Sequence, residues 1–209
     1  MLNTILLCLT LATSPLSPEI IATRAEAMGY HNTTYKRALV LSHAIYEASL
    51  LFDMPVEVIT AVIERETAYQ KDQVSTAQCR GPMQLMPKTF KILSKALGMP
   101  KANIDETETN ILFGSYYLSV LYQKYGRWDA ALTAYNRGPG RYDHDRHHRI
   151  NEYAKKVIDR AKRIEAAQEY YLQSGPKCSS REYEERLDTE PTLTYDSGIC
   201  SPNSDHQSP

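Results

Sequence analysis

A helical repeat of apolar positions runs through the chain from about Tyr35 to Tyr171. Apolar residues spaced three and four positions apart form one face of a helix. Alternating runs of β-branched residues bounded by hairpin turns are missing from the same stretch. We therefore expect a mainly α protein. Its predicted helices span residues 35–51, 55–67, 87–97, 109–125, 129–135 and 149–171.

The segment PVEVITAVIERET, residues 55–67, carries the most informative of these patterns. Pro55 suits a first helical turn, and Asp53 is expected to cap it. At about 100° per residue, Glu66 falls near the middle of the apolar stripe. Glu57 and Glu64 are predicted to project to the opposite side. The stripe itself consists of Val58, Ile59, Val62 and Ile63.

A carboxyl group on a face built for burial loses hydration, and this loss raises its pKa. A carboxyl that stays protonated near neutral pH can act as a general acid, for example on a glycosidic oxygen. The structural alternative is a Glu near the end of a helix, paired with a neighbouring Lys or Arg. Glu66 is the candidate acid, and Arg65 lies at the edge of the same stripe.

The charge distribution divides the chain of 209 residues into a mildly basic body and an acidic end. The net charge is −1, but residues 28–170 hold 20 Lys and Arg against 16 Asp and Glu. Residues 171–209 hold 3 against 7. A basic body suits an anionic polymer such as a cell-wall glycan, and no nucleic-acid motif is present. We expect one domain at 28–172 and an acidic, mobile tail at 173–209.

Residues 2–13 form an apolar run too short to span a bilayer. We interpret residues 1–27 as a signal peptide, although no Lys or Arg precedes the run; a retained N-terminal helix or anchor is the alternative. Export would permit one disulfide among the remaining cysteines. We favour a bond between Cys178 and Cys200, and we interpret Cys79 as a small buried thiol.

Histidines are frequent in RYDHDRHHR, residues 141–149, but their spacing does not match a metal site. We interpret this segment as a solvated loop and expect neither a metal nor another cofactor. His43 lies among apolar residues and is predicted to be a core or boundary histidine. The loop acids are interpreted as solvated charges; these are Asp72, Asp105, Glu106 and Glu108.

Four sequence blocks follow one another in a fixed order and carry a resemblance to a known family. They are IERETAY around Glu66, GPMQLMP at 81–87, TNILFGSYYL at 109–118 and AYNRGPG at 134–140, with a weaker block, INEYAKKV, at 150–157. The stretch from Tyr35 to Ala167 resembles the catalytic domain of lytic transglycosylases of the soluble (SLT) type, relatives of goose-type lysozyme. The resemblance implies a lysozyme-like single helical domain with a cleft.

The resemblance also implies roles for particular side chains. Glu66 would be the catalytic residue. Tyr135 would hydrogen-bond the acid, and Asn136 would hold the N-acetyl group of the substrate. Further substrate-binding residues are implied at Thr67, Gly81, Met83, Gln84, Tyr117 and Tyr153, with Asn110 and Gly114 beside Tyr117. For Met83 a role as core filler, and for Tyr135 a place in the core, remain the structural alternatives.

This chain departs from the family pattern at three positions. Thr67 stands where Ser is usual and retains the hydroxyl. Pro82 stands where Leu is common and removes a backbone donor. Arg137 stands where a small residue is usual and is a candidate for contact with an acidic stem peptide.

The implied reaction uses one glutamate. That residue protonates the glycosidic oxygen between MurNAc and GlcNAc, the substrate's N-acetyl oxygen supports the anomeric carbon, and the same glutamate then takes the proton from the C6 hydroxyl. The product is a 1,6-anhydro end. Two alternatives stay open, a lysozyme-type hydrolase of the same bond and a non-catalytic scaffold that binds peptidoglycan.

The expected setting follows from these interpretations. We expect a monomer that is secreted across the inner membrane and stays periplasmic, in association with the cell wall. Its partners would be peptidoglycan strands and, because the chain is small, a secretion, conjugation or phage machinery for which it opens local gaps.

Overall fold

The computed structural model describes residues 35–70 and 73–174, and all of the secondary structure that it describes is helical apart from two isolated bridges. The signal peptide predicted at 1–27, the bond predicted between Cys178 and Cys200, Asp72, and nearly all of the predicted tail lie outside the described residues. The mainly α prediction is confirmed for the part that is described.

The helices begin and end close to the predicted positions. They are α3 (Tyr35–Phe52), α4 (Val56–Thr67), α5 (Pro87–Ala96), α6 (Thr107–Tyr125), α7 (Trp128–Arg137), α8 (Pro139–His144) and α9 (Glu152–Ser174). The short helix α8 was not predicted. Gly138, with φ 87°, separates it from α7, and Pro139 occupies its first turn. The segment interpreted as a solvated loop is therefore partly helical.

The start of α4 differs from the expectation. Pro55 is the residue before the first helical turn, and no side chain caps the helix. Asp53 has φ 50°, a left-handed conformation within the turn between α3 and α4. The predicted cap by Asp53 is wrong, because Pro55 occupies the N-cap position and no side chain hydrogen-bonds to the first turn.

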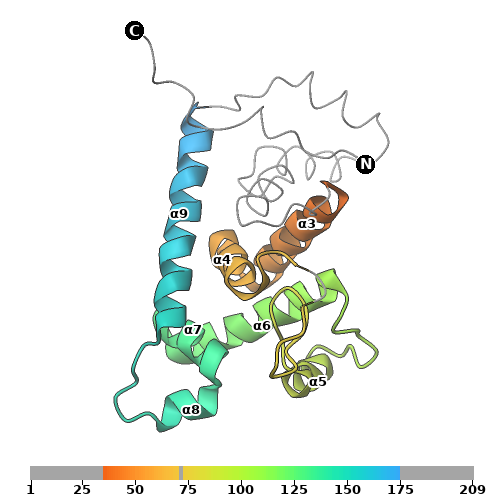
Figure 1. Cartoon of the computed structure of the whole chain (residues 1–209), viewed down its shortest axis with the longest axis vertical. Helices are drawn as coiled ribbons and strands as arrows, with labels where there is room; N and C mark the ends of the chain where they lie inside the picture. Colours follow the sequence, from red (N-terminus) through yellow and green to blue (C-terminus); the bar gives the residue numbers. More distant parts are fainter. Residues whose placement is uncertain (1–34, 71–72, 175–209) are drawn as a thin grey trace.

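In Figure 1, α6 crosses the middle of the domain, with α3 and α4 on one side and α5 and α8 on the other. The long helix α9 runs along the edge and packs against α4 and α7. The main core joins residues of α3, α4, α6, α7 and α9. A second apolar cluster lies beneath α5; its fully or nearly buried members are Leu85, Phe90, Leu93 and Phe113. This frame places α4 between α3 and α9.

Both sides of α4 are covered, which the sequence pattern did not predict. Thr60, Ala61 and Glu64 are buried along with the apolar stripe. Glu64 has only 8% of its surface exposed. The side of α4 that was predicted to be opposite the apolar stripe is therefore buried at Glu64, where α9 packs against α4 and Arg160 pairs with this carboxylate.

Candidate active site

Glu66 lies in the last turn of α4 and is partly buried. The hydroxyl of Tyr153 donates a hydrogen bond to its Oε1 at 2.7 Å. Tyr153 belongs to the first turn of α9, so the bond joins segments 87 residues apart. The packing of α9 against α4 thus brings a phenol to the candidate acid.

The electrostatic environment favours the protonated form of Glu66. Burial raises the pKa of this carboxyl, while the hydrogen bond from Tyr153 and the charge of Arg65 lower it by less. Arg65 is exposed, as is expected at the edge of the stripe. Burial, Tyr153 and Arg65 are the influences on this pKa, and none of them is a carboxylate. A carboxyl in this environment can hold a proton and release it to a bound substrate.

A second tyrosine, Tyr135, lies near the acid, and Tyr117 packs against it. The rings of Tyr117 and Tyr135 are tilted against each other with centroids 5.4 Å apart. Burial raises the pKa of Tyr135 well above its usual value, and the charge of Glu66 adds to this effect. The hydroxyl of Tyr135 donates to the carbonyl of Met83 at 2.8 Å. The hydrogen bond to the acid that we expected of Tyr135 is made by Tyr153 instead.

The loop GPMQLMP is held from below by Asn110, a buried residue of α6. The Oδ1 atom of Asn110 accepts from the backbone N–H of Met83 at 2.9 Å, and its Nδ2 donates to the carbonyls of Arg80 and Ile104 at 2.9 and 3.0 Å. A Cβ on Gly81 would lie 2.3 Å from Asn110 Nδ2. Gly81, with φ 74°, therefore permits a tight turn that is packed on this amide.

Met83 does not line an open surface, because its side chain is fully buried. A Cβ on Gly114 would lie 2.5 Å from its sulfur, so the small residue of α6 makes room for a loop side chain rather than for another helix. For Met83 the alternative reading as core filler describes the contacts better than substrate binding.

Gln84 occupies a left-handed conformation, with φ 49°. Its Nε2 donates to the carbonyls of Gln73 and Gly81 at 2.9 and 3.0 Å, so both amide hydrogens are used inside the loop. The amide oxygen has no protein donor among the described residues, and the side chain is partly buried. Gln84 therefore retains acceptor capacity for a ligand, whereas its donor capacity is spent on the loop.

Thr67 and Asn136 have different surroundings from each other. Thr67 is buried, and its hydroxyl lies 3.1 Å from the Pro82 carbonyl and 3.3 Å from the Ile63 carbonyl. This residue ties α4 to the GPMQLMP loop. Asn136 is exposed at the end of α7, where its Oδ1 accepts from Asn151 Nδ2 at 2.9 Å. Its own amide hydrogens remain available to a ligand.

The buried carboxylate of Glu64 is a residue that the sequence reasoning missed. Its Oε1 accepts from the hydroxyl of Tyr69 at 2.5 Å, and its Oε2 is paired with Arg160 of α9. The available signal was the strong amphipathic pattern of residues 149–171, which includes an arginine two turns after Tyr153 and so on the same face. Glu64 and Arg160 join the same two helices as Glu66 and Tyr153.

The histidines and loop acids take no part in this cluster. Within the described residues, no group of three or more His, Cys, Asp and Glu side chains is arranged around a potential metal position. His43 is partly exposed and lies 3.6 Å from Glu47, and Asp105 pairs with Arg80 at 2.7 Å.

None of the described helices combines the length and the hydropathy needed to cross a membrane.

Comparisons with known proteins agree with this arrangement. The family model for the transglycosylase SLT domain matches residues 43–158. The soluble lytic murein transglycosylase of Salmonella typhimurium is 36% identical over 86 residues, which cover 39% of this chain and 13% of that protein. The membrane-bound lytic murein transglycosylase C of Photorhabdus laumondii is 30% identical over 118 residues, covering 50% and 33%. The chain thus matches only a minor part of each of these relatives.

Solved structures show the same fold at low sequence identity. An inactive mutant of lytic transglycosylase Slt from Pseudomonas aeruginosa superposes with a TM-score of 0.54 at 20% identity, covering 79% of this chain and 32% of that one. The 70 kDa soluble lytic transglycosylase of Escherichia coli gives 0.52 at 22%, with the same coverage. These likenesses confirm the mainly α, lysozyme-like fold class. Because the family model spans more than half of the sequence, the chain belongs to the transglycosylase SLT domain family.

Proposed function

We propose that this protein is a peptidoglycan lytic transglycosylase that cleaves the β-1,4 bond between MurNAc and GlcNAc and leaves a 1,6-anhydro end. The observation that carries the proposal is the environment of Glu66: a partly buried carboxyl whose pKa is raised by burial and whose Oε1 accepts a hydrogen bond from the Tyr153 hydroxyl. Relatives named as lytic murein transglycosylases support the same reaction.

The hydrogen bond from Tyr153 assigns different tasks to the two oxygens of Glu66. Oε1 accepts the hydrogen bond from the Tyr153 hydroxyl at 2.7 Å, so the acidic proton is carried by Oε2. Oε2 delivers this proton to the glycosidic oxygen as the bond to the anomeric carbon breaks. The resulting carboxylate keeps the bond from Tyr153, which stabilises its charge until the second proton transfer.

The second step returns the proton to the same residue. Once the leaving sugar has departed, the C6 hydroxyl of the muramic ring attacks the anomeric carbon and gives its proton to Glu66. A hydrolase needs a second group to form a covalent intermediate or to activate water. Attack by the sugar's own hydroxyl needs no second acid, and it suits a site in which the influences on the pKa of Glu66 include no carboxylate.

The remaining candidate residues divide into contacts for the substrate and supports for the site. The Gln84 carbonyl oxygen, the Asn136 amide and the paired rings of Tyr117 and Tyr135 are the groups that we assign to the glycan. Thr67, Gly81 and Met83 act through the loop that carries Gln84. Tyr153 positions the acid.

The products of intact sacculi test the reaction directly. Purified protein is incubated with sacculi, and the released muropeptides are measured by mass spectrometry. We expect fragments lighter by one water than the corresponding reducing ends. Fragments with ordinary reducing ends would instead identify a hydrolase, and release of no fragments beyond the level of a Glu66→Gln control would identify a binding protein.

We further propose that the enzyme works as a monomer in the periplasm, at the cell wall, and opens local gaps for a secretion, conjugation or phage machinery. This setting is motivated by the wall substrate and the small domain. Fractionation of cells expressing the full chain, followed by crosslinking and mass spectrometry, tests it. Recovery only from the cytoplasm, or recovery at the wall without any assembly component, would contradict the respective part.

A further inference from the structure

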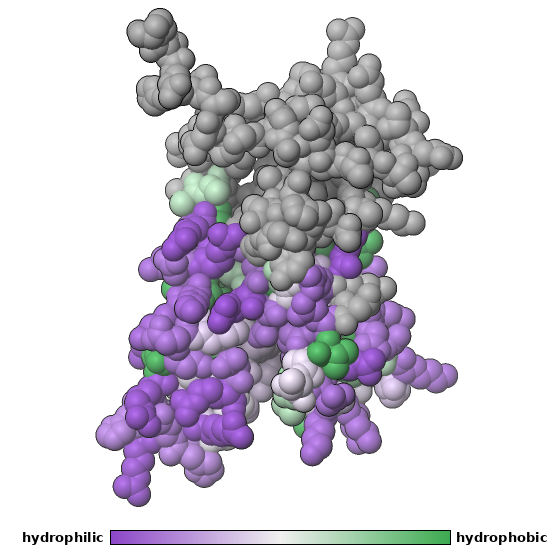
Figure 2. Space-filling model, in the orientation of Figure 1, coloured by the Kyte–Doolittle hydropathy of each residue, from purple (hydrophilic) through white to green (hydrophobic). Residues whose placement is uncertain are grey.

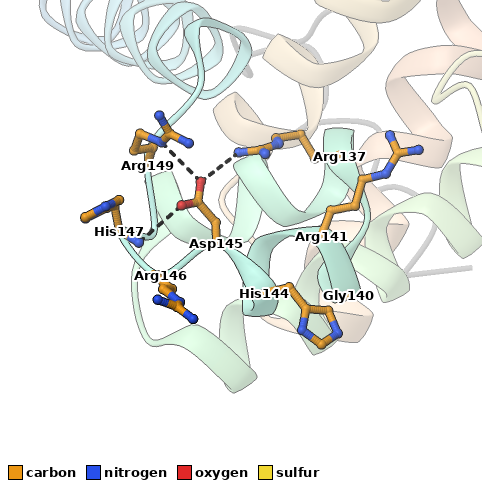
Figure 3. A pocket seen from close by; sticks show the side chains of 8 residues that line it. All are labelled: Arg137, Gly140, Arg141, His144, Asp145, Arg146, His147 and Arg149. Atoms are coloured by element: carbon orange, nitrogen blue, oxygen red, sulfur yellow. Dashed lines mark hydrogen bonds and ion pairs between the residues drawn. The ribbon is translucent and has the colours of Figure 1, made fainter.

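Positively charged side chains gather around a surface hollow of about 630 Å³ beside α8. We call it the α8 hollow. Four arginines and two histidines line it, together with one acid, Asp145 (Figure 3). The basic residues are Arg137, Arg141, His144, Arg146, His147 and Arg149. None of the residues assigned to glycan cleavage is among them.

The carboxylate of Asp145 already interacts with three neighbouring residues. Its side chain is only 6% exposed. The backbone N–H of His147 donates to its Oδ1 at 3.1 Å, and Arg137 and Arg149 each lie 3.4 Å from its Oδ2. Figure 3 shows these two guanidinium groups turned toward the carboxylate. The His147 N–H is the main influence that lowers the pKa of Asp145, so this acid is ionised at neutral pH.

The other two arginines are exposed and have no acidic partner within the described part of the chain. In Figure 3, Arg141 and Arg146 extend away from Asp145. The neighbouring Asp143 does not compensate them, because its carboxylate accepts from Lys124 at 2.6 Å and from Tyr125 at 2.8 Å. The hollow therefore has four guanidinium groups against one carboxylate, and it retains binding capacity for an anion.

Residues that line the hollow are close in sequence to residues of the candidate active site. Arg137 directly follows Asn136, and Arg149 lies two residues before Asn151. Asn151 donates to Asn136, and Tyr153, two residues further on, donates to Glu66. A ligand that contacts Asn136 therefore lies next to a wall of the hollow.

The chemistry of the hollow favours carboxylates on a flexible polar chain. A guanidinium group matches a carboxylate with two parallel hydrogen bonds. The surface at the position of α8 is hydrophilic in Figure 2, so apolar burial contributes little there. The peptides attached to the muramic sugars of peptidoglycan are short and polar, and they carry carboxylates close to the glycan. They match the hollow in charge, and their attachment matches its position.

We infer that the α8 hollow binds carboxylates of the peptide carried by the muramic sugar, so that the protein distinguishes peptide-bearing from peptide-free glycan. Arg141 and Arg146 lie apart in Figure 3, and each contacts its own carboxylate of the peptide. Arg137, the contact proposed from the sequence, and Arg149 are instead held in place by Asp145. The inference rests on the proposed function, because it takes peptidoglycan as the ligand.

Binding to a protein that does not turn over tests the inference separately from the reaction. In a Glu66→Gln background, calorimetry compares three probes at low and moderate salt: a muropeptide disaccharide with an acidic peptide, the same compound with its carboxylates amidated, and the disaccharide alone. The test variant is Arg141→Gln with Arg146→Gln. The matched control is Lys156→Gln with Lys162→Gln, which removes two exposed charges from α9.

We expect the reference protein to prefer the acidic probe over the amidated one by roughly five- to tenfold, as two partly exposed charge-assisted contacts provide. The preference should shrink to about one in the Arg141 and Arg146 variant, and it should persist in the lysine control. Equal binding of the two probes by the reference protein would overturn the inference.

Two other results would also overturn it. An equal loss of preference in the lysine control would mean that the overall charge of the domain is responsible. Displacement of the muropeptide by a glycerol phosphate polymer at lower concentration than by the free acidic peptide would assign the hollow to phosphate. Failure of the proposed reaction shows instead in the products from sacculi, which this binding measurement does not use.

Discussion

Glu64 and Glu66 leave the same helix two residues apart and meet different surroundings. Glu64 is paired with the guanidinium of Arg160 and accepts a second bond from Tyr69. Glu66 accepts one side-chain hydrogen bond among the described residues, from the phenol of Tyr153, and burial is the strongest influence on its pKa. Arg160 and Tyr153 belong to α9, and Tyr69 lies in the turn after α4.

The difference shows that burial of a carboxylate does not by itself identify a catalytic acid. A guanidinium partner compensates the negative charge, so the carboxylate serves to join two elements. A neutral partner leaves most of the desolvation uncompensated, so the carboxyl can exchange a proton within the usual pH range. We therefore expect identical substitutions at the two positions to have different consequences.

The largest effect is expected from Glu66→Gln. The amide keeps the shape and still accepts from Tyr153, but it has no proton to deliver. Loss of a general acid costs about 10²- to 10⁴-fold in rate. Release of muropeptides from sacculi should fall by that factor, while binding to sacculi is retained. Turnover within a factor of about two of the unmodified protein would exclude acid catalysis by Glu66.

The next largest effect is expected from Glu64→Gln, and it concerns stability. The change leaves the charge of Arg160 without its partner in a partly buried position. We expect a loss of roughly 1–3 kcal/mol in the free energy of unfolding, reduced from the range for fully buried pairs because Arg160 retains solvent contact. Urea denaturation at neutral pH measures it.

The control for Glu64→Gln is Glu152→Gln, which removes an exposed charge from α9 that pairs with the exposed Lys155. A change of less than about 0.5 kcal/mol is expected there. If both variants lose the same small amount, the pair of Glu64 and Arg160 does not stabilise the contact between α4 and α9.

The sequence predicted the helices and the partial burial of Glu66 for physical reasons that can be named. The helical periodicity predicted α5 and α6, and Pro87, Gly98 and Gly126 predicted where they begin or end, since start and stop signals depend on the local backbone. The partial burial of Glu66 could be predicted because this residue interrupts an apolar stripe at a position where burial is expected. These signals depend on residues close together in the chain.

The features that the sequence did not predict depend on tertiary contacts. Glu64 looked polar and exposed because the pattern of one helix cannot show that a second helix covers its other face. The exchange of roles between Tyr135 and Tyr153 has the same origin, because it depends on how α9 docks on α4. The supporting role of Asn110 required knowledge of a loop that lies 27 residues away.

A smaller effect is expected from Tyr153→Phe. This change removes the hydrogen bond that stabilises the ionised form of Glu66. The hydrogen bond from Tyr153 lowers the pKa of Glu66, so its removal raises that pKa further. Cleavage requires the protonated acid and declines as the pH rises through its pKa. The alkaline limb of the rate profile should therefore move to higher pH, and the maximal rate should fall by less than about tenfold.

Tyr122→Phe is the matched control for this shift, because Tyr122 stacks on Trp128 and does not contact Glu66. Its profile should coincide with that of the unmodified protein. An alkaline limb that moves to lower pH in Tyr153→Phe would mean that the phenol does not stabilise the ionised carboxylate.

The smallest effect is expected in the stability of Glu66→Gln, and its sign opposes that of Glu64→Gln. The folded state holds the proton of Glu66 more tightly than the unfolded state, because burial raises the pKa above 4.5. Ionisation therefore costs stability as the pH rises from 4.5 through the folded pKa. Glu66→Gln avoids this cost. Its free energy of unfolding should match that of the unmodified protein at low pH and exceed it at neutral pH, as measured by urea denaturation at both values. A variant that is less stable at neutral pH would show that Glu66, like Glu64, holds the fold together through its charge, and the distinction between the two carboxylates would then be lost.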